Sequence, residues 1–315
     1  MKVHRLRAEP THSCWDRSLE PRLRIAPGET VHLECVDASG GQVKPGMTLE
    51  ELQSIDRTRI HALTGPIWIE GAEPGDVLEV EVLSLRHHGW GWSSVLSGLG
   101  FLKERFPDPY LFHWHLDDDL SASLEPAVIP LRPFLGVMGA ARADAGSFRT
   151  RPPGPFGGNM DVPELSAGAK LYLPVFNSGA LFSCGDGHAA QGHGEVCVNG
   201  IECALDATLC FRLHSQQVLS APLVESSDLM RGDSTAEAWI VVESGGDIAE
   251  TARRATGRMI DLLVSRWGFQ DVHAYILCSV AMSLKLSQVV NEPMHTVTAA
   301  ISKAILPRRT LFPLQ

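Results

Sequence analysis

The chain has 315 residues, of which 44% are hydrophobic and 20% are charged, and its formal net charge at pH 7 is -10. This composition is typical of a globular protein and excludes a disordered or fibrous chain. The acidic balance, without clusters of lysine and arginine, excludes nucleic acid as an expected partner.

The first 14 residues hold no apolar run of signal-peptide length, and no later apolar segment reaches the roughly 18 residues needed to span a bilayer. We therefore predict a cytoplasmic protein without a membrane partner. Seven cysteines lack any CxxC pair, so reduced and mostly buried thiols are expected. They are Cys14, Cys35, Cys184, Cys197, Cys203, Cys210 and Cys278. Cys184, directly before Gly-Asp-Gly-His, is kept as an alternative nucleophile.

Up to about residue 220, frequent glycine and proline with short apolar runs predict strands joined by turns. Strands are expected at residues 29–38 and 76–85, and two short buried strands within 167–183. Asn199-Gly200 lies between two apolar runs of the segment 195–213, which predicts a hairpin there. The segment 90–119 is interpreted as an irregular, aromatic-rich connection, and long connections of this kind are usually functional.

After residue 230 the pattern changes. Residues 236–244 predict another strand, and Asp247 predicts an N-cap for a helix from Ile248 to about Trp267. Asp271 is expected to cap a second helix through Ser287. Its expected core-facing residues are Val272, Tyr275, Ile276, Ser279, Val280 and Leu286.

The predicted fold is therefore mostly β, with sandwich- or barrel-like sheets and C-terminal α-helices, an α+β protein. We expect one domain over residues 1–315, β-rich in 1–245 and helical in 246–305.

Two glycine-rich motifs, FGGNMD at 156–161 and GDGHAAQGHGE at 185–195, gather polar side chains at what we interpret as a site. These side chains are Asn159, Asp161, Asp186, His188, Gln191, His193 and Glu195. Two residues apart in an extended segment, Asp186 and His188 point to one face and can share a metal ion. Beyond them, Gly192 and Gly194 favour a loop that curls around something small.

Structural alternatives exist for each of these residues taken alone. An aspartate next to glycine commonly caps a turn, which applies to Asp186 and, in DASGGQ at 37–42, to Asp37. A lone histidine is more often hydrogen-bonded in a loop than bound to metal. The pair His113 and His115 is a weaker metal candidate, so only the density of the glycine-rich cluster favours a reactive site.

Carboxylates, imidazole and amides around a glycine-rich hollow favour hydrolysis of a small polar substrate by metal-activated water. Glu195 is the expected general base. A serine nucleophile has less support, because the chain has no GxSxG motif.

The motifs resemble those of the acetamidase/formamidase family of amide hydrolases. The resemblance covers nearly the whole chain in order: DASGGQ, GPIWIEGAEPGDVLEVEV, GWGWSS with FPDPY, RPFLGVMG, PFGGNMD, YLPVFNSGALFSCGDGHAAQGHGEV and AYILCSVAMSLKLSQVVNEP. It implies hydrolysis of a short non-peptide amide to carboxylate and ammonia, a mostly β fold and a homo-oligomer. The positions it places at the reaction centre are Asp37, Asn159, Asp161, Asp186, His188, Gln191 and Glu195.

From the resemblance we expect a divalent metal, with zinc preferred and calcium as the alternative. Asp37, Asp186 and His188 are its predicted ligands. Catalytic roles are predicted for Glu195 as base, Asn159 as the residue that orients the amide, and Asp161 and Gln191 beside them.

One departure from the family pattern is His193, where relatives carry an acidic residue between the glycines. It could change metal preference or pH dependence, or have no effect if the side chain points outward. The GWGWSS segment and Phe101 are expected to roof the pocket, favouring substrates with apolar bulk over formamide. A lactam-hydrolysing activity, a Cys184-dependent amidase and a non-catalytic binding protein of the same fold remain alternatives.

Overall fold

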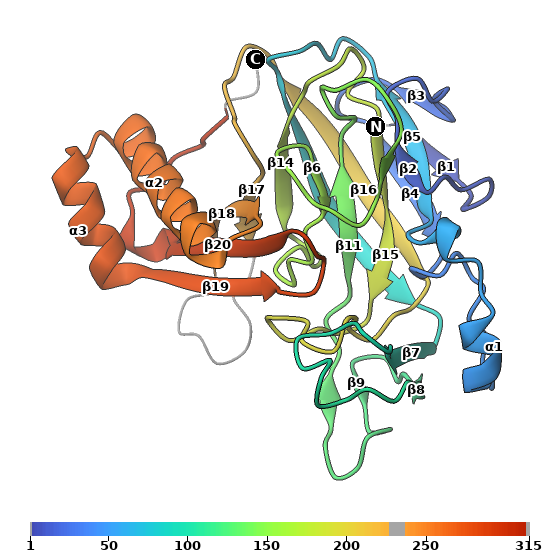
Figure 1. Cartoon of the computed structure of the whole chain (residues 1–315). Helices are drawn as coiled ribbons and strands as arrows, with labels where there is room; N and C mark the ends of the chain where they lie inside the picture. Colours follow the sequence, from blue (N-terminus) through green and yellow to red (C-terminus); the bar gives the residue numbers. More distant parts are fainter. Residues whose placement is uncertain (1, 227–236, 313–315) are drawn as a thin grey trace.

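The computed structural model describes residues 2–226 and 237–312. Within these residues, two sheets account for most strands (Figure 1). The larger sheet has nine strands in the order β1 (Val3–Leu6), β4 (Thr30–Cys35), β16 (Leu205–His214), β6 (Val77–His87), β14 (Lys170–Pro174), β17 (Leu223–Ser226), β18 (Ala238–Gly245), β20 (His295–Ser302) and β19 (Met282–Gln288).

The smaller sheet has five strands in the order β13 (Gly157–Asn159), β11 (Phe134–Gly139), β15 (Phe182–His188), β5 (Leu63–Ile69) and β3 (Leu23–Ile25). Three strand pairs complete the described β structure: β7 (Trp90–Val95) with β8 (Tyr110–His115), β9 (Leu120–Ser121) with β10 (Ile129–Pro130), and β2 (Cys14–Trp15) with β12 (Phe148–Arg149). The helices are α1 (Leu49–Gln53), α2 (Ile248–Trp267) and α3 (Asp271–Ala281), with 3₁₀ turns η1 (Arg57–Arg59) and η2 (Lys303–Ile305).

The main core lies where the two sheets face each other. On β6, apolar and polar residues alternate so that Val80 and Val82 are fully buried, and they pack with residues such as Leu135 of β11 and Phe182 of β15. This packing of inner sheet faces confirms the predicted mostly β fold with sandwich-like sheets. The strands expected at 29–38 and 76–85 are confirmed as β4 and β6, and those within 167–183 as β14 and the start of β15.

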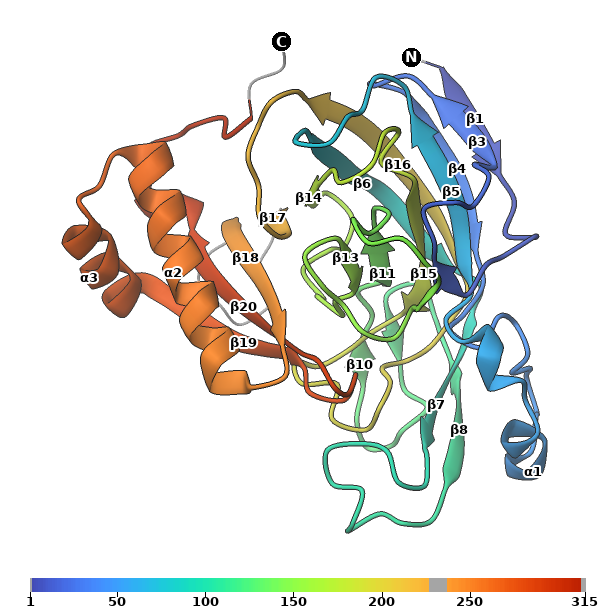
Figure 2. The ribbon, with the colours of Figure 1, turned by 45° about the horizontal axis from the view of Figure 1, so that its top comes forward.

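A second core lies under the two C-terminal helices, which pack on the β18 and β20 end of the large sheet (Figure 2). The helix predicted from Ile248 to Trp267 is confirmed as α2. Its cap is also confirmed, since the Asp247 carboxylate accepts the Glu250 N–H at 2.7 Å. None of the described helices combines the length and apolar character that a bilayer span requires.

The second predicted helix ends earlier than expected. Helix α3 stops at Ala281, and the next seven residues form the edge strand β19, paired with β20. Met282, Leu284 and Leu286 recur at every second residue, which is the strand period that the helical interpretation overlooked. The C-terminal part is therefore helices plus two strands, and the N-cap of α3 is Gln270 rather than Asp271.

The predicted core face of this helix was also wrong. Ala274 and Cys278 are its buried residues, whereas Val272, Tyr275, Ile276 and Val280 are exposed. The sequence pattern marked an apolar surface but not whether the protein's own chain covers it.

Two predictions in the loop regions were wrong as well. Asn199-Gly200 forms no hairpin: the Asn199 side chain bonds Ser94 instead, accepting its N–H at 3.0 Å, and Glu202 pairs with Trp92. The segment 90–119 contains two strands, β7 and β8, that pair with each other in an antiparallel hairpin. Local sequence did not reveal this pairing.

Candidate active site

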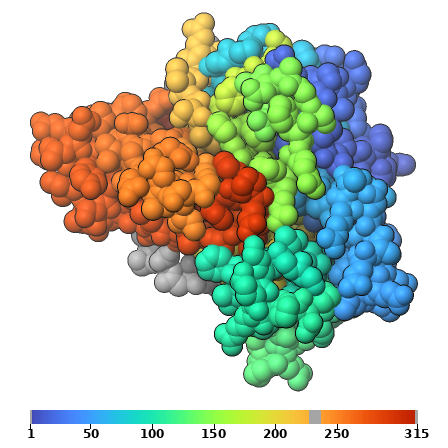
Figure 3. All heavy atoms as spheres, in the orientation of Figure 1, coloured from blue at the N-terminus to red at the C-terminus, as the bar shows by residue number. Residues whose placement is uncertain are grey.

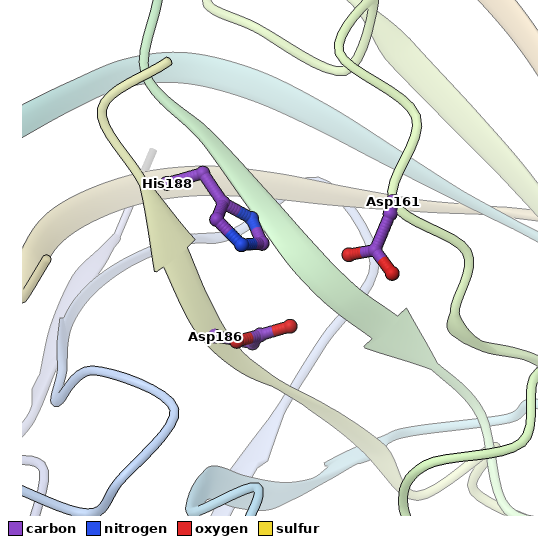
Figure 4. Close-up of side chains that lie close together, drawn as sticks. All are labelled: Asp161, Asp186 and His188. Atoms are coloured by element: carbon purple, nitrogen blue, oxygen red, sulfur yellow. The ribbon is translucent and has the colours of Figure 1, made fainter. Parts of the chain in front are cut away.

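The acids and imidazole of the two glycine-rich motifs meet beside strand β11. Asp186 and His188 lie on β15, and Asp161 lies in the segment that follows β13; Figure 4 shows the three side chains pointing toward one another. One ligand atom from each lies within 4.8 Å of the others, and all three residues are buried. The sequence prediction that Asp186 and His188 share a face is confirmed, with Asp161 as the third member.

The approach of these side chains depends on a glycine of β11. A Cβ placed on Gly136 would lie 2.5 Å from Asp161 Oδ1, 2.7 Å from Asp186 Oδ2 and 2.8 Å from His188 Cε1. All three distances are well inside van der Waals contact. The three groups therefore occupy the space that any other residue at position 136 would fill.

The backbone at the site is strained in the way that functional residues often are. Asp161, Asp186 and Glu195 all have left-handed φ angles, of 50°, 58° and 49° respectively. Such angles cost aspartate and glutamate free energy and persist only where surrounding packing imposes them. The fold thus holds three carboxylates of one site in unfavourable backbone conformations.

His188 is fixed by contacts on both its ring face and one ring nitrogen. Its ring stacks on Phe134, with centroids 5.0 Å apart, and its Nε2 lies 2.6 Å from Glu202 Oε1 and 3.7 Å from Glu195 Oε1. Its buried Nδ1 has no hydrogen-bond partner among the described residues. With Nε2–H donated to Glu202, the Nδ1 lone pair is available, which is how metal-binding imidazoles are commonly arranged.

The buried acids strongly perturb one another. Burial, together with the charge of Asp186, raises the pKa of Asp161 to about 8, and burial raises the pKa of Asp186 to about 6. Burial and then the charges of Asp161 and Glu202 raise the pKa of Glu195 well above its usual range. Burial alone would lower the pKa of His188, but Glu202 and Asp186 outweigh it and raise that pKa to about 10. Positive charge in this cluster is therefore strongly favoured.

Several buried oxygens near the imidazole have no hydrogen-bond partner among the described residues: Asn159 Oδ1, Asp161 Oδ1, Gln191 Oε1, Glu195 Oε2 and Glu202 Oε2. The second oxygen of Asp161 is satisfied, since it accepts from Asn291 Nδ2 at 2.5 Å. Unpaired buried carboxylate oxygens are costly unless a cation or ligand completes them. This donor set of carboxylate oxygens and one imidazole nitrogen fits zinc and also admits calcium.

A cavity of about 350 Å³ opens next to this cluster, and its lining includes Asn159, Asp186, Glu195, Glu202 and Asn291. Leu52 of α1, Leu99 after β7 and Asn291 after β19 all line it. The space-filling view shows the corresponding blue, teal and red segments near one another on one face (Figure 3). The predicted convergence holds: Asn159 lines the cavity directly, and His188 lies behind the lining residue Glu202, to which it is bonded.

Two predicted site residues have other contacts. Gln191 Nε2 donates to the backbone oxygens of Asp161 and Ser287, both at 3.2 Å, so this side chain ties the loop to the site. Among the described residues, two groups could hold a metal ion: Asp161 with Asp186 and His188, and His188 with Glu195 and Glu202. Asp37 belongs to neither. Its carboxylate accepts from the Ser39 N–H at 2.7 Å and from the Ser39 hydroxyl, so it stabilises its own turn. The geometry therefore groups Asp161, rather than Asp37, with Asp186 and His188.

His193 does not point outward. Its Nε2 lies 3.1 Å from Glu164 Oε1, and that fully buried carboxylate also lies 3.4 Å from Lys285 Nζ. Burial raises the pKa of Glu164, but His193 and Lys285 outweigh it, so the pKa lies below its usual range. The contact anchors the loop that carries Glu195 two residues later.

The other candidates from sequence lie elsewhere. Cys184 is fully buried, and its contact with Cys35 and its burial raise the pKa of its thiol well above the usual range, which disfavours a thiolate nucleophile. His113 Nε2 lies 2.9 Å from the Met47 carbonyl oxygen, and His115 is exposed beside Asp117. Neither belongs to the described metal-ligand groups.

Sequence reasoning missed three residues that matter here. Glu202 was missed because it lies 14 positions after His188, in the segment predicted to form a hairpin. Asn291 and Gly136 lie in segments distant from the glycine-rich motifs. A cue for Gly136 existed, since a glycine inside an apolar strand often marks a close approach.

Comparison with known proteins agrees with this geometry. The model of the "Acetamidase/Formamidase family" matches residues 2–146 and 140–308. A Schizosaccharomyces pombe protein with a provisional formamidase name is 31% identical over 340 residues, covering 86% of this chain and 83% of that protein. A formamidase of Methylophilus methylotrophus is 28% identical over 240 residues, 59% of each chain. The crystal structure of an acetamidase from Bacillus halodurans superposes with a TM-score of 0.87 at 30% identity, covering 94% of this chain and 96% of that one.

Proposed function

The chain belongs to the acetamidase/formamidase family and is an amidohydrolase that acts on short linear amides, and we propose that it does so with water activated at a divalent cation. The observation that carries this proposal is the convergence of Asp161, Asp186 and His188 beside a cavity that exposes Asn159 and Glu195. In the proposal, Asp161, Asp186 and His188 hold the cation, and zinc is the preferred ion, with calcium as the alternative. When bound, such a cation lowers the pKa of water and polarises an amide carbonyl.

The proposed base is Glu195. Its carboxylate lines the cavity and has an unpaired Oε2. Burial and then the neighbouring acids raise its pKa well above the usual range, which makes the ionised carboxylate a stronger proton acceptor. Glu195 takes a proton from water as the water oxygen bonds to the amide carbon. It then delivers that proton to the nitrogen as the C–N bond breaks, which leaves the carboxylic acid and ammonia. The acid then passes its proton to ammonia or water and becomes the carboxylate.

The other site residues orient the reactants. The unpaired Oδ1 of Asn159 can accept from the amide N–H of the substrate, and Asn291 holds Asp161 by its hydrogen bond. Glu202 accepts from His188 Nε2 and so fixes which ring nitrogen is free. Gln191 is assigned a positioning role through its bonds to backbone oxygens.

The proposal is tested by ammonia release from formamide, acetamide, propionamide and a γ-lactam by the natural chain and by the variant Glu195→Gln. We expect hydrolysis of linear amides, a loss of at least a hundredfold in kcat for the variant, and retained amide binding by the variant. Undiminished turnover by Glu195→Gln would remove Glu195 as the base. Binding without turnover by the natural chain would favour a non-catalytic binding protein.

We also propose that the chain works as one cytoplasmic unit over residues 1–315, and as a homo-oligomer. Hydrogen bonds of the large sheet that link the β-rich part to strands β20 and β19 support a single unit. The exposed apolar side chains of α3 support self-association, since Val272, Tyr275, Ile276 and Val280 are 56–74% exposed. Substituting Tyr275→Glu should lower the molar mass measured by light scattering if this face joins two copies.

A further inference from the structure

We propose that the preferred substrate is an anionic amide, namely a primary amide whose acyl group is a short hydrocarbon chain that ends in a carboxylate. This inference rests on the proposed amide hydrolysis and names the substrate class of the same cavity. Three observations support it: the size of the cavity, the apolar character of its wall, and the arginines in its lining that have no carboxylate partner among the described residues.

The cavity is larger than the smallest amides require. Acetamide has four non-hydrogen atoms and, at the roughly 30 Å³ that a water molecule occupies in the liquid, fills about 120 Å³. That is about a third of the 350 Å³ available. A substrate that excludes water from the whole cavity therefore has roughly ten non-hydrogen atoms, and water exclusion strengthens the electrostatic interactions on which hydrolysis depends.

The lining combines side chains of different character. It carries the acids and amides of the site. The wall carries apolar side chains contributed by α1 and the segment after it, by β7 and the loop after it, and by the loop after β15; they are Leu52, Ile55, Trp92, Leu96, Leu99 and Val198. Such a wall binds a hydrocarbon segment of the acyl group, gaining roughly 0.8 kcal/mol per buried methylene.

Three arginines also line the cavity, and two of them, Arg57 and Arg149, are exposed, while Arg151 is half-buried. Among the described residues, none of the three guanidinium groups lies within 4.0 Å of a carboxylate. Arg151 donates to the Val290 carbonyl oxygen at 2.8 Å, and this is its only described hydrogen bond.

Some other buried or half-buried arginines of the protein do contact carboxylates. Arg212 and Arg258, by contrast, each contact a glutamate, the latter at 2.7 Å. The side chains of Arg57 and Arg149 have no described hydrogen bond, and a guanidinium group fits a planar carboxylate, which can accept two parallel N–H bonds. The cavity thus combines the acids of the reaction centre with guanidinium groups that can bind an anionic end of the acyl chain.

A simpler role for these arginines is to offset the negative charge of the buried acids. In that case they would favour all amides equally. The two roles are separated by a substrate pair of equal carbon number, one charged and one neutral, because only the proposed role changes the ratio between them.

The experiment measures kcat/KM for acetamide, butanamide, pentanamide, hexanamide and the half-amides of butanedioic, pentanedioic and hexanedioic acid. We expect the best half-amide to exceed the neutral amide of the same carbon number at least tenfold, with a smaller advantage at 0.5 M than at 0.05 M salt. Arg149→Gln and the double variant Arg149→Gln/Arg151→Gln should reduce this ratio, the latter to near one. The control Arg253→Gln changes an exposed arginine of α2 that pairs with Glu250, and should keep the ratio.

The outcomes distinguish this inference from the function on which it rests. Neutral amides hydrolysed as fast as half-amides, or a ratio unchanged in Arg149→Gln and in the double variant, would overturn the inference while amide hydrolysis stands. Failure to hydrolyse any amide of the panel would instead remove the proposed function. The single variant removes an exposed side chain without a hydrogen bond, so its ratio can be measured even if the double variant folds poorly.

Discussion

The substitution Gly136→Ala tests the geometry of the site with a single methyl group. Position 136 has an ordinary strand conformation, so alanine meets no backbone strain there, and any effect comes from contacts. Its Cβ would lie 2.5–2.8 Å from one atom each of Asp161, Asp186 and His188, roughly 0.6–0.9 Å short of ordinary contact. Overpacking of this kind typically costs about 1–3 kcal/mol of stability.

The larger effect is expected on the site itself. Metal ligands tolerate displacements of only about 0.2 Å, and a misplacement near 1 Å can cost about a hundredfold in rate. We therefore expect Gly136→Ala to lose bound metal and to release ammonia from acetamide at least a hundredfold more slowly. Metal content by mass spectrometry and ammonia release are the readouts.

The matched control is Gly257→Ala in α2, where an added Cβ meets nothing within 4 Å. We expect unchanged activity and a free energy of unfolding raised by about 0.5–1 kcal/mol, because alanine is the better helix former. Should Gly136→Ala keep full metal content and activity, the three side chains do not converge as described, and the reasoning is refuted.

Three further predictions concern the groups around this centre. Glu202→Gln should weaken metal binding about ten- to a hundredfold by competition with a chelator, because the site's imidazole loses its carboxylate partner; unchanged affinity would contradict this role. Glu79→Gln should lower the free energy of unfolding by about 2–3 kcal/mol at pH 7 in urea titrations, since Glu79 lies 2.7 Å from buried His214. Although burial opposes it, the contact with His214 lowers the pKa of Glu79 below its ordinary 4.5, so this contribution is present above pH 4.5 and is lost as pH falls further; a difference that persists at pH 2 would oppose the assignment. His193→Ala should lower kcat/KM about fivefold, equivalent to about 1 kcal/mol, because the loop loses its anchor at Glu164, and hydrogen exchange in that loop should speed up.

The local features of the fold were predictable where one strong signal acted alone. The N-cap and apolar spacing of α2 and the alternation of β6 were sufficient to place those elements. The strand β19 was mistaken for helix, because its stability comes from pairing with β20, which local sequence does not reveal. The hairpin expected at Asn199-Gly200 failed for the same reason, since that loop bonds to β7 instead.

The site was predictable to the extent that its residues share a motif. Asp186 and His188 follow from their spacing, and Asn159 and Asp161 from the neighbouring glycines. The position of Glu202 depends on how the loop after β15 folds back on His188, and no spacing rule encodes that. Asp37 shows a limit of local sequence, because a turn-forming aspartate and a ligand have the same sequence signature.

The most direct test of the account is activity as a function of metal content. The chain is stripped with a chelator, dialysed, and titrated with Zn²⁺ or Ca²⁺ while ammonia release from acetamide is followed. We expect activity to fall with metal removal and to return as the ion is added, and His188→Ala to bind the ion far more weakly. If elemental analysis shows the protein to be metal-free and it still has full activity, the proposal that a cation held by Asp161, Asp186 and His188 activates the water is contradicted.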